Sequence, residues 1–258
     1  MFDVKGVTVG RGAEGAAGTV SRRERMREEL VGAITAAAAQ QLAEGGREAV
    51  SLRGIAREVG IAPASVYTYF ASVDDVITAV IAAAFGALAT SMESAVEQEQ
   101  SARGRLRAAI LAYRRWAHDH PEEFLLLYAS PLRGFEAPAD GPTTLQAMRV
   151  NMALLSPLVA AWAAGELPEP PRGHPLHSAE LPADISPDQL RVGVMAWAQV
   201  HGFVLLELNG HIPRVAADYD AWFAAEVDEL LDRLGFAPVG PVSPSGRPRR
   251  RSGRGGRA

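Results

Sequence analysis

Side chains able to form hydrogen bonds with another molecule gather in residues 51–76, SLRGIAREVGIAPASVYTYFASVDDV. Near the middle, Val66 and Phe70 are spaced to share the buried face of a short helix. The hydroxyl and phenol groups around them are directed elsewhere, and they belong to Ser65, Tyr67, Thr68 and Tyr69. Such groups both donate and accept hydrogen bonds. The segment therefore offers a polar binding surface on a small apolar support.

Two short helices are predicted to hold this surface in place. Four apolar residues at helical spacing form the buried stripe of the first helix: Leu52, Ile55, Ala56 and Val59. Ser51 precedes that helix as its N-cap and Gly60 ends it, while Pro63 opens the second helix. Two short helices joined by a glycine-containing turn form a helix-turn-helix, and the second helix of that motif enters the major groove of DNA. The residues therefore predict a DNA-binding module.

Composition limits the remaining possibilities. The 258 residues, 48% of them apolar, can build one large or two small domains of a soluble globular protein. There is no cysteine, which excludes disulfides and thiolate metal ligands. The N-terminus lacks the apolar core of a signal peptide, and no run approaches the roughly 18 apolar residues of a membrane span. We therefore expect a cytoplasmic protein without a membrane partner.

The net charge of −4 argues mildly against a general nucleic-acid binder, but the distribution of charge is more informative. Arginines gather before the helix-turn-helix and in its first helix: Arg22, Arg23, Arg25, Arg27, Arg53 and Arg57. Helical periodicity predicts an amphipathic helix over 22–43, whose arginine-rich beginning would lie near the DNA module. Residues 1–20 and the arginine-rich tail 237–258 are expected to be disordered, with weak phosphate attraction as the alternative role of the tail.

The rest of the chain has the periodicity of helices. Ser72, followed by Asp74 and Asp75, predicts the capped start of a long connecting helix. Further stripes predict helices over 101–118, 145–162, 190–208 and 218–234, and residues 124–128 are apolar on all sides and should be buried. The predicted fold is all-α, with a three-helix helix-turn-helix domain over 21–80 and a helical-bundle regulatory and dimerisation domain over 81–236.

The last two predicted helices have more apolar surface than one neighbour can cover. This favours a two-fold dimer made by a four-helix bundle, with Trp197, His201 and Phe223 as interface candidates. For His201, a hydrogen-bonded core or interface histidine is favoured over a ligand-binding one. A ligand cavity between helices has five candidate lining residues: Trp116, Tyr128, Met148, Met152 and Trp162.

These features resemble the tetracycline-repressor (TetR) family of bacterial transcriptional regulators. The resemblance is carried by AREVGI at 56–61 and by a short helix that ends in Tyr67-x-x-Phe70, followed by an N-capped long helix and an all-helical domain. WAQVHG, with Trp197, His201 and Gly202, resembles a Trp-His-Gly branch of that family, and YRRWAHDHPEEFLLLY at 113–128 fits the same branch.

The resemblance implies roles for individual residues. Arg53 would reach a base edge and Ser51 a phosphate, in agreement with the chemistry of a guanidinium fork and a hydroxyl. Tyr67 and Tyr69 would clamp the DNA backbone, with Tyr67 exposed. The groove-facing positions would be Pro63, Ala64, Ser65 and Thr68. Val73 departs from the family, because a lysine that contacts phosphate usually stands there, so affinity must come from other contacts. The small side chains of the second helix also favour readout of DNA shape.

The resulting hypothesis is a homodimeric, ligand-responsive regulator, most simply a repressor of a pseudo-palindromic double-stranded DNA operator, with a small apolar effector and no cofactor. One alternative is a DNA-binding dimer controlled by a protein partner. The other is a helical enzyme, for which there is no Glu-x-x-His pair, glycine-rich phosphate loop or nucleophile motif. His174 and His177 form an HxxH without further ligands in sequence, so no metal site is predicted.

Overall fold

The computed structural model describes residues 21–128, 140–173, 185–212 and 216–238, and within these ranges the regular elements are all helices. The bounds are α1 Arg22–Gly45, a 3-10 turn Arg47–Ala49, α2 Leu52–Val59, α3 Pro63–Val66, α4 Val73–Glu97, α5 Ala102–Asp119, α6 Pro121–Tyr128, α7 Pro142–Ala163, α8 Pro187–Leu208 and α9 Tyr219–Leu234. The predicted all-α class is confirmed. The predicted arm and most of the predicted tail lie outside the described residues, as do His174 and His177.

The chain divides into two compact units. Unit 1 comprises Met1–Ala84 and Leu125–Leu145, and unit 2 comprises Phe85–Phe124 and Gln146–Ala258. The chain passes from unit 1 to unit 2 within α4. The predicted boundary at residue 80 is close to this division, but a second segment, 125–145, also belongs to unit 1.

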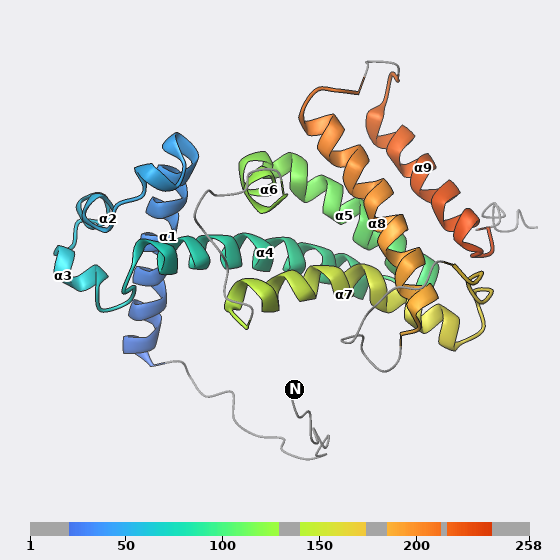
Figure 1. Cartoon of the computed structure of the whole chain (residues 1–258), viewed down its shortest axis with the longest axis horizontal. Coiled ribbons are helices and arrows are strands. Elements are labelled where there is room, and N and C mark those ends of the chain that lie inside the picture. Colours follow the sequence, from blue (N-terminus) through green and yellow to red (C-terminus); the bar gives the residue numbers. More distant parts are fainter. Residues whose placement is uncertain (1–20, 129–139, 174–184, 213–215, 239–258) are drawn as a thin grey trace, which may run out of the picture. The chain divides into compact units, whose positions relative to one another are not determined.

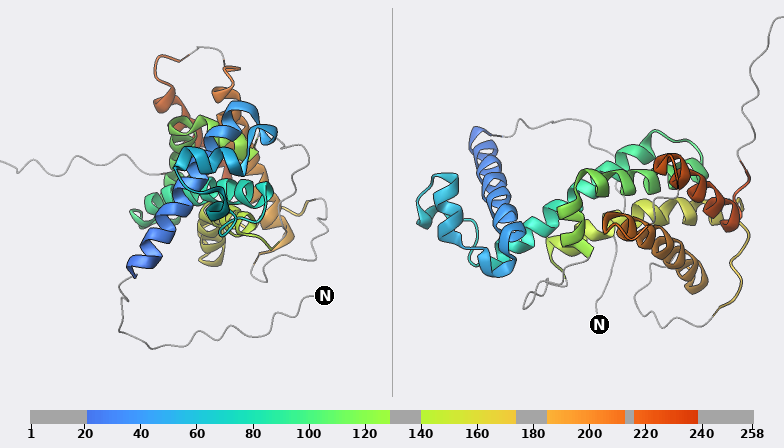
Figure 2. Two further views of the ribbon diagram at one scale, coloured as in Figure 1. Left: turned by 90° about the vertical axis from the view of Figure 1, so that its left-hand side faces the viewer. Right: turned by 90° about the horizontal axis from the view of Figure 1, so that it is seen from above.

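Unit 1 is organised around α1, which packs across α2 (Figures 1 and 2). Ile34 of α1, Ile55 of α2 and Val66 of α3 are all fully buried, so the three helices share one core. Ser51 caps α2 by accepting a hydrogen bond from the backbone N–H of Gly54, at 3.0 Å. Gly60 ends α2 at φ +76°, a left-handed conformation that glycine adopts without strain.

Unit 2 places α8 and α9 beside α5 (Figure 1). Tyr113 and Ala117 of α5, Val204 of α8 and Leu231 of α9 form the centre of its core, each fully buried. Capping residues mark the helix starts as the sequence predicts, with Ser101 before α5 and Asp218 before α9. At α8 the cap is Ser186, so the helix begins three residues before the first residue of the predicted stripe.

Three elements differ from prediction. The helix predicted to reach Phe70 ends at Val66, because the backbone then tightens into turns in which Thr68 N–H donates to Ser65 C=O and Tyr69 N–H to Val66 C=O. In α6, Phe124 is buried, but Leu125–Tyr128 are only half-buried, so the prediction of a fully buried segment is wrong for most of it.

The third difference concerns α4, which by length and composition alone could cross a membrane, contrary to the expectation that no segment would do so. Half of its most apolar window is buried inside the protein, which is typical of the core helix of a globular unit.

Candidate functional site

The polar surface predicted from the sequence lies on the exposed side of α2, α3 and the turn that follows. Arg53 and Arg57 are exposed on α2, and Pro63 and Ala64 are exposed at the start of α3. Neither arginine forms an ion pair with a described residue. Both guanidinium groups therefore keep their charge and their donors for another molecule.

The residues after α3 extend this surface. Tyr67 is 54% exposed, which confirms that its phenol is directed away from the core. Tyr69 is half-buried, and the guanidinium of Arg27 from α1 lies 5.9 Å from the centre of its ring. The Thr68 hydroxyl donates to the carbonyl of Ala64 at 3.4 Å, whereas Ser65 is half-buried. The structure thus leaves most of the predicted DNA-contacting residues at the surface of unit 1, with Ser65 and Tyr69 half-buried.

A glutamine that the sequence reading did not single out holds α2 at both ends. The amide oxygen of Gln41 accepts from the backbone N–H of Ser51 at 3.1 Å, and its amide nitrogen donates to Glu58 at 3.2 Å. A Cβ on Gly54 would stand 3.1 Å from that amide, so glycine permits this close approach. Gln41 therefore fixes the angle at which α2 leaves α1, and no local spacing signals it because Glu58 is 17 residues away.

The first turn of α4 is acidic and capped. Ser72 accepts from the N–H of Asp75 at 3.1 Å, and Asp75 accepts from the N–H of Ser72 at 3.0 Å. Asp74 is paired with Arg47, which donates at 2.8 Å. Val73 is half-buried and supplies no cation. Within the part of unit 1 that the structure describes, attraction for a polyanion therefore depends mainly on arginines of α1 and α2.

The five predicted pocket residues do not line the cavity that the structure describes between α8 and α9. Trp116 is 6% exposed and stacks on His120, and Trp162 is 6% exposed with its indole N–H donating to the carbonyl of Pro168. Met148 and Met152 are 57% and 39% exposed on α7, so their apolar stripe lies on the surface. Periodicity identifies an apolar face but does not reveal whether the fold covers it.

A cavity of about 340 Å³ lies instead between α8 and α9. It is lined by Gln199, Val200, Phe203, Ile212, Trp222, Phe223, Glu226, Val227 and Leu230. Three aromatic rings line it, and the Trp222 indole donates to Glu226 at 2.9 Å. Its volume lies in the range of small-molecule sites, roughly 300–1,000 Å³. The chemistry of this lining suits a small apolar molecule.

The three predicted interface residues are only partly available to a partner. Phe223 is 2% exposed and packs against Phe203, with ring centres 5.1 Å apart, so little of its side chain is available to a partner. Trp197 is half-buried and stacks on His201 with ring centres 4.9 Å apart. Exposed apolar side chains of α8 lie elsewhere, at Val194, Met195 and Leu206.

His201 is held inside unit 2. Its Nδ1 is 2.8 Å from the Tyr113 hydroxyl, and burial lowers the pKa of His201 below its ordinary value of 6.5. The prediction of a hydrogen-bonded histidine is confirmed. The neutral imidazole, Tyr113 and Trp197 together join α5 to α8.

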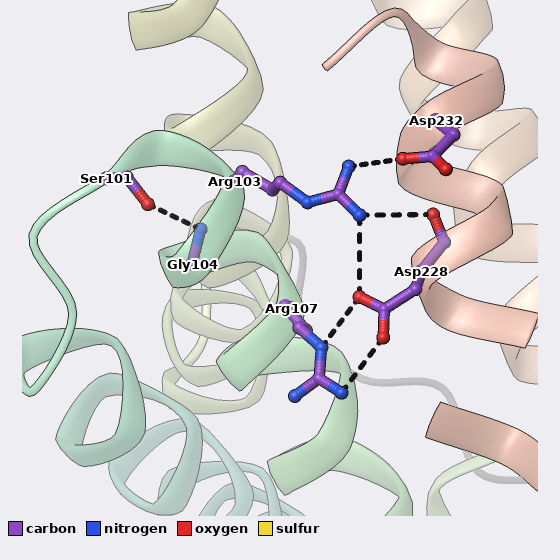
Figure 3. A network of polar contacts seen from close by, with 6 residues as sticks. All are labelled: Ser101, Arg103, Gly104, Arg107, Asp228 and Asp232. Atoms are coloured by element: carbon purple, nitrogen blue, oxygen red, sulfur yellow. Dashed lines mark hydrogen bonds and ion pairs between the residues drawn. The ribbon is translucent and has the colours of Figure 1, made fainter. Parts of the chain in front are cut away.

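One face of α5 carries arginines that bind α8 and α9, and the sequence reading missed it. Arg103 donates to Asp232 at 2.6 Å and Arg107 donates to Asp228 at 2.8 and 3.0 Å (Figure 3). Arg103 is 9% exposed in its side chain, and its two terminal nitrogens reach both aspartates of α9. The acids lie more than 100 residues away in sequence, so local spacing could not predict these pairs.

Further along α5, Arg114 lies at the centre of another group of charged side chains. It donates two hydrogen bonds to Glu207 of α8, at 2.8 and 2.7 Å, and one to Asp220 of α9, at 2.7 Å. His118 Nε2 is 3.0 Å from the same Glu207 carboxylate. Burial acts to raise the pKa of Glu207, but hydrogen bonds from Arg114 and His118 outweigh it and the pKa lies below 4.5.

Two family models match most of this chain. Residues 34–80 match the model described as bacterial regulatory proteins, tetR family, and residues 106–230 match the tetracyclin repressor-like C-terminal domain. HTH-type transcriptional regulators of Mycobacterium bovis (Mb1846) and Mycobacterium tuberculosis (Rv1816) are 33% identical over 150 residues. The match covers 57% of this chain and 64% of each relative, a little under two thirds of their length.

Solved structures share the fold. A crystal structure described as that of a regulatory protein, SCO4313, superposes with a TM-score of 0.62 at 25% identity, covering 82% of this chain and all of the other. FadR from Bacillus subtilis, in complex with stearoyl-CoA, superposes with a TM-score of 0.55 at 17% identity, covering 78% of this chain and 95% of FadR. At such low identity the second comparison concerns the fold alone.

Proposed function

We propose, because this chain belongs to the TetR family of bacterial regulatory proteins, that it acts in the cytoplasm as a homodimeric transcriptional regulator whose DNA binding is controlled by a small molecule. The observation that carries the proposal is the exposed side of α2 and α3, where Arg53 and Tyr67 are both exposed and Ser51 caps α2. Arginine suits a base edge and a phenol suits a phosphate oxygen.

Dimerisation is proposed through the outer face of α8. Met195, Gln199, Gly202 and Leu206 follow one another at spacings of three or four residues and so share that face. Met195 and Leu206 are 64% and 49% exposed, and a Cβ added at Gly202 would meet no atom within 4 Å. An apolar face with a small residue at its middle lets a second helix approach closely.

The cavity between α8 and α9 is the proposed effector site. Met148 and Met152, which the sequence offered as lining candidates, are exposed on α7 and do not line this cavity. Gln199 lines this cavity and also belongs to the outer face of α8, so a bound molecule could alter the dimer contact and hence the spacing of the two DNA-binding units. FadR, which is in complex with stearoyl-CoA, shows that a protein of this fold can hold an organic molecule. The cavity favours a small molecule over a protein partner as the signal.

Release of DNA requires that the effector bind more tightly to a form of the dimer in which the spacing of the two DNA-binding units does not fit the operator. A molecule with equal affinity for both forms would shift nothing, and moving the equilibrium from 1:99 to 99:1 needs a preference of about 10⁴-fold. Repression is the simplest outcome for a protein that occupies an operator and dissociates from it when the effector binds.

The test is a titration of the purified chain with a duplex from the DNA immediately upstream of its own gene and with a random-sequence duplex of equal length. We expect tighter binding to the upstream duplex at the same salt concentration. Equal binding to both duplexes would refute regulation at that DNA.

A further inference from the structure

The face of α1 that packs into the core of unit 1 carries arginines closer to the N-terminus of the helix. Ile34 is fully buried, and Arg27 precedes it by seven residues and Arg23 by eleven. At about 100° per residue, both arginines lie within roughly 20° of the direction of Ile34, on the side that faces the helix-turn-helix. Arg25 precedes Ile34 by nine residues and is directed about 180° away.

Arg27 is held against the turn that follows α3. Its guanidinium carbon lies 5.9 Å from the centre of the Tyr69 ring. Arg27 itself is exposed and forms no ion pair with any residue that the structure describes. A guanidinium over an aromatic face is oriented by the ring without losing its charge or its outer N–H donors. The geometry therefore leaves the Arg27 donors available beside the Tyr69 phenol.

Other charges near the helix-turn-helix do not replace this one. Asp74 and Asp75 begin α4 and bring two carboxylates, of which Asp74 is matched by Arg47 at 2.8 Å. Arg53 and Arg57 are exposed on α2, so their positive charges belong to a different helix from that of Arg27.

We propose that Arg27 binds a DNA phosphate and that the Tyr69 ring is its positioning group, so that α1 and the turn after α3 grip the DNA backbone together. The inference rests on the proposed function, since it takes the duplex as the partner. An arginine and a phenol held side by side supply three or more donors to neighbouring phosphate oxygens, which adds affinity without sequence preference.

The experiment compares Arg27→Ala with Arg25→Ala in the full chain, using the upstream duplex and the random-sequence duplex between about 50 and 200 mM salt. Both variants remove the same charge from the same helix. We expect Arg27→Ala to weaken binding to both duplexes about tenfold and to reduce the slope of log K against log salt by about 0.9 per subunit. Arg25→Ala should keep the parent's slope, and Arg27→Lys should restore the slope with incomplete recovery of affinity.

Tyr69→Leu tests the positioning role. With the ring removed, Arg27→Ala should cost less affinity than it does in the parent, because the guanidinium is no longer oriented. Circular dichroism melting of each variant separates loss of contact from loss of fold, and we expect Arg27→Ala to melt with the parent.

The inference would be overturned by equal effects of Arg27→Ala and Arg25→Ala, or by an unchanged slope for Arg27→Ala. The two proposals fail separately. A parent that binds both duplexes equally refutes regulation at the upstream DNA, yet the random-sequence duplex still measures the phosphate contact of Arg27. A parent that binds neither duplex refutes both.

Discussion

Glu207→Ala removes the carboxylate that binds Arg114 twice and His118 once. The side chains of Arg114 and Glu207 are only 10% and 11% exposed, so the guanidinium would stay desolvated without its main partner. Loss of one member of a buried ion pair costs about 3–5 kcal/mol. Asp220 keeps one of the three hydrogen bonds to Arg114, which places our expectation at the lower end, about 3 kcal/mol, or a fall in Tm of about 6–12 °C for a unit of this size.

Tryptophan fluorescence is the appropriate assay, because Trp116, Trp162, Trp197 and Trp222 all belong to unit 2 and report its unfolding alone. Arg233→Ala is the control, since Arg233 is 51% exposed and pairs with Glu229 at 3.6 Å, an arrangement worth at most about 0.5 kcal/mol. Arg114→Met combined with Glu207→Leu should recover most of the loss, because an apolar pair of similar volume needs no partner.

The sign of the pH dependence follows from the lowered pKa of Glu207. Its contribution is present above the ordinary value of 4.5 and is lost as pH falls through the lowered value in the folded protein. Unit 2 of Glu207→Ala should therefore lose less stability on acidification than the parent does. A Glu207→Ala protein within about 1 kcal/mol of the parent at pH 7 would refute the reasoning, since it would show that Arg114 needs no buried counter-charge.

Three further outcomes are expected. Arg53→Ala should relax preference at one base pair per half-site and cost about 1–3 kcal/mol, whereas Tyr67→Phe should weaken binding to all sequences alike; binding to single-base operator variants distinguishes them. Because burial lowers the pKa of His201, the parent should lose stability as pH falls from 6.5 towards that lowered value, and His201→Gln should remove this loss in urea unfolding followed by fluorescence. Met195→Glu and Leu206→Glu should give folded monomers by light scattering; persistent dimers would place the contact on another face.

The sequence predicted the parts of the fold that depend on neighbours along the chain. Ser51 and Gly60 bracket α2, and Asp218 begins α9, because a cap acts within one helical turn. The exposure of Tyr67 follows from its spacing relative to Val66 and Phe70.

Features that depend on distant residues were not accessible in this way. Arg114 lies on α5 next to a buried stripe, but its partner Glu207 is 93 residues away. Phe223 and Met152 both sit on apolar stripes, yet one is buried and the other exposed, since only the packing of other helices decides which stripe is covered. The early end of α3 likewise reflects the turns around Thr68 rather than any helix-breaking residue.

Gly202 makes the outer face of α8 sensitive to the addition of a single methyl group. Alanine is the better helix former by about 1 kcal/mol, and its methyl group would meet nothing in the isolated subunit, so the free monomer should gain stability from that substitution. In a two-fold dimer the same methyl occurs twice at one contact and holds two helices apart. In the dimer proposed through α8, the single hydrogen at Gly202 therefore lets the two helices approach closely, although glycine makes the helix of the lone subunit less stable.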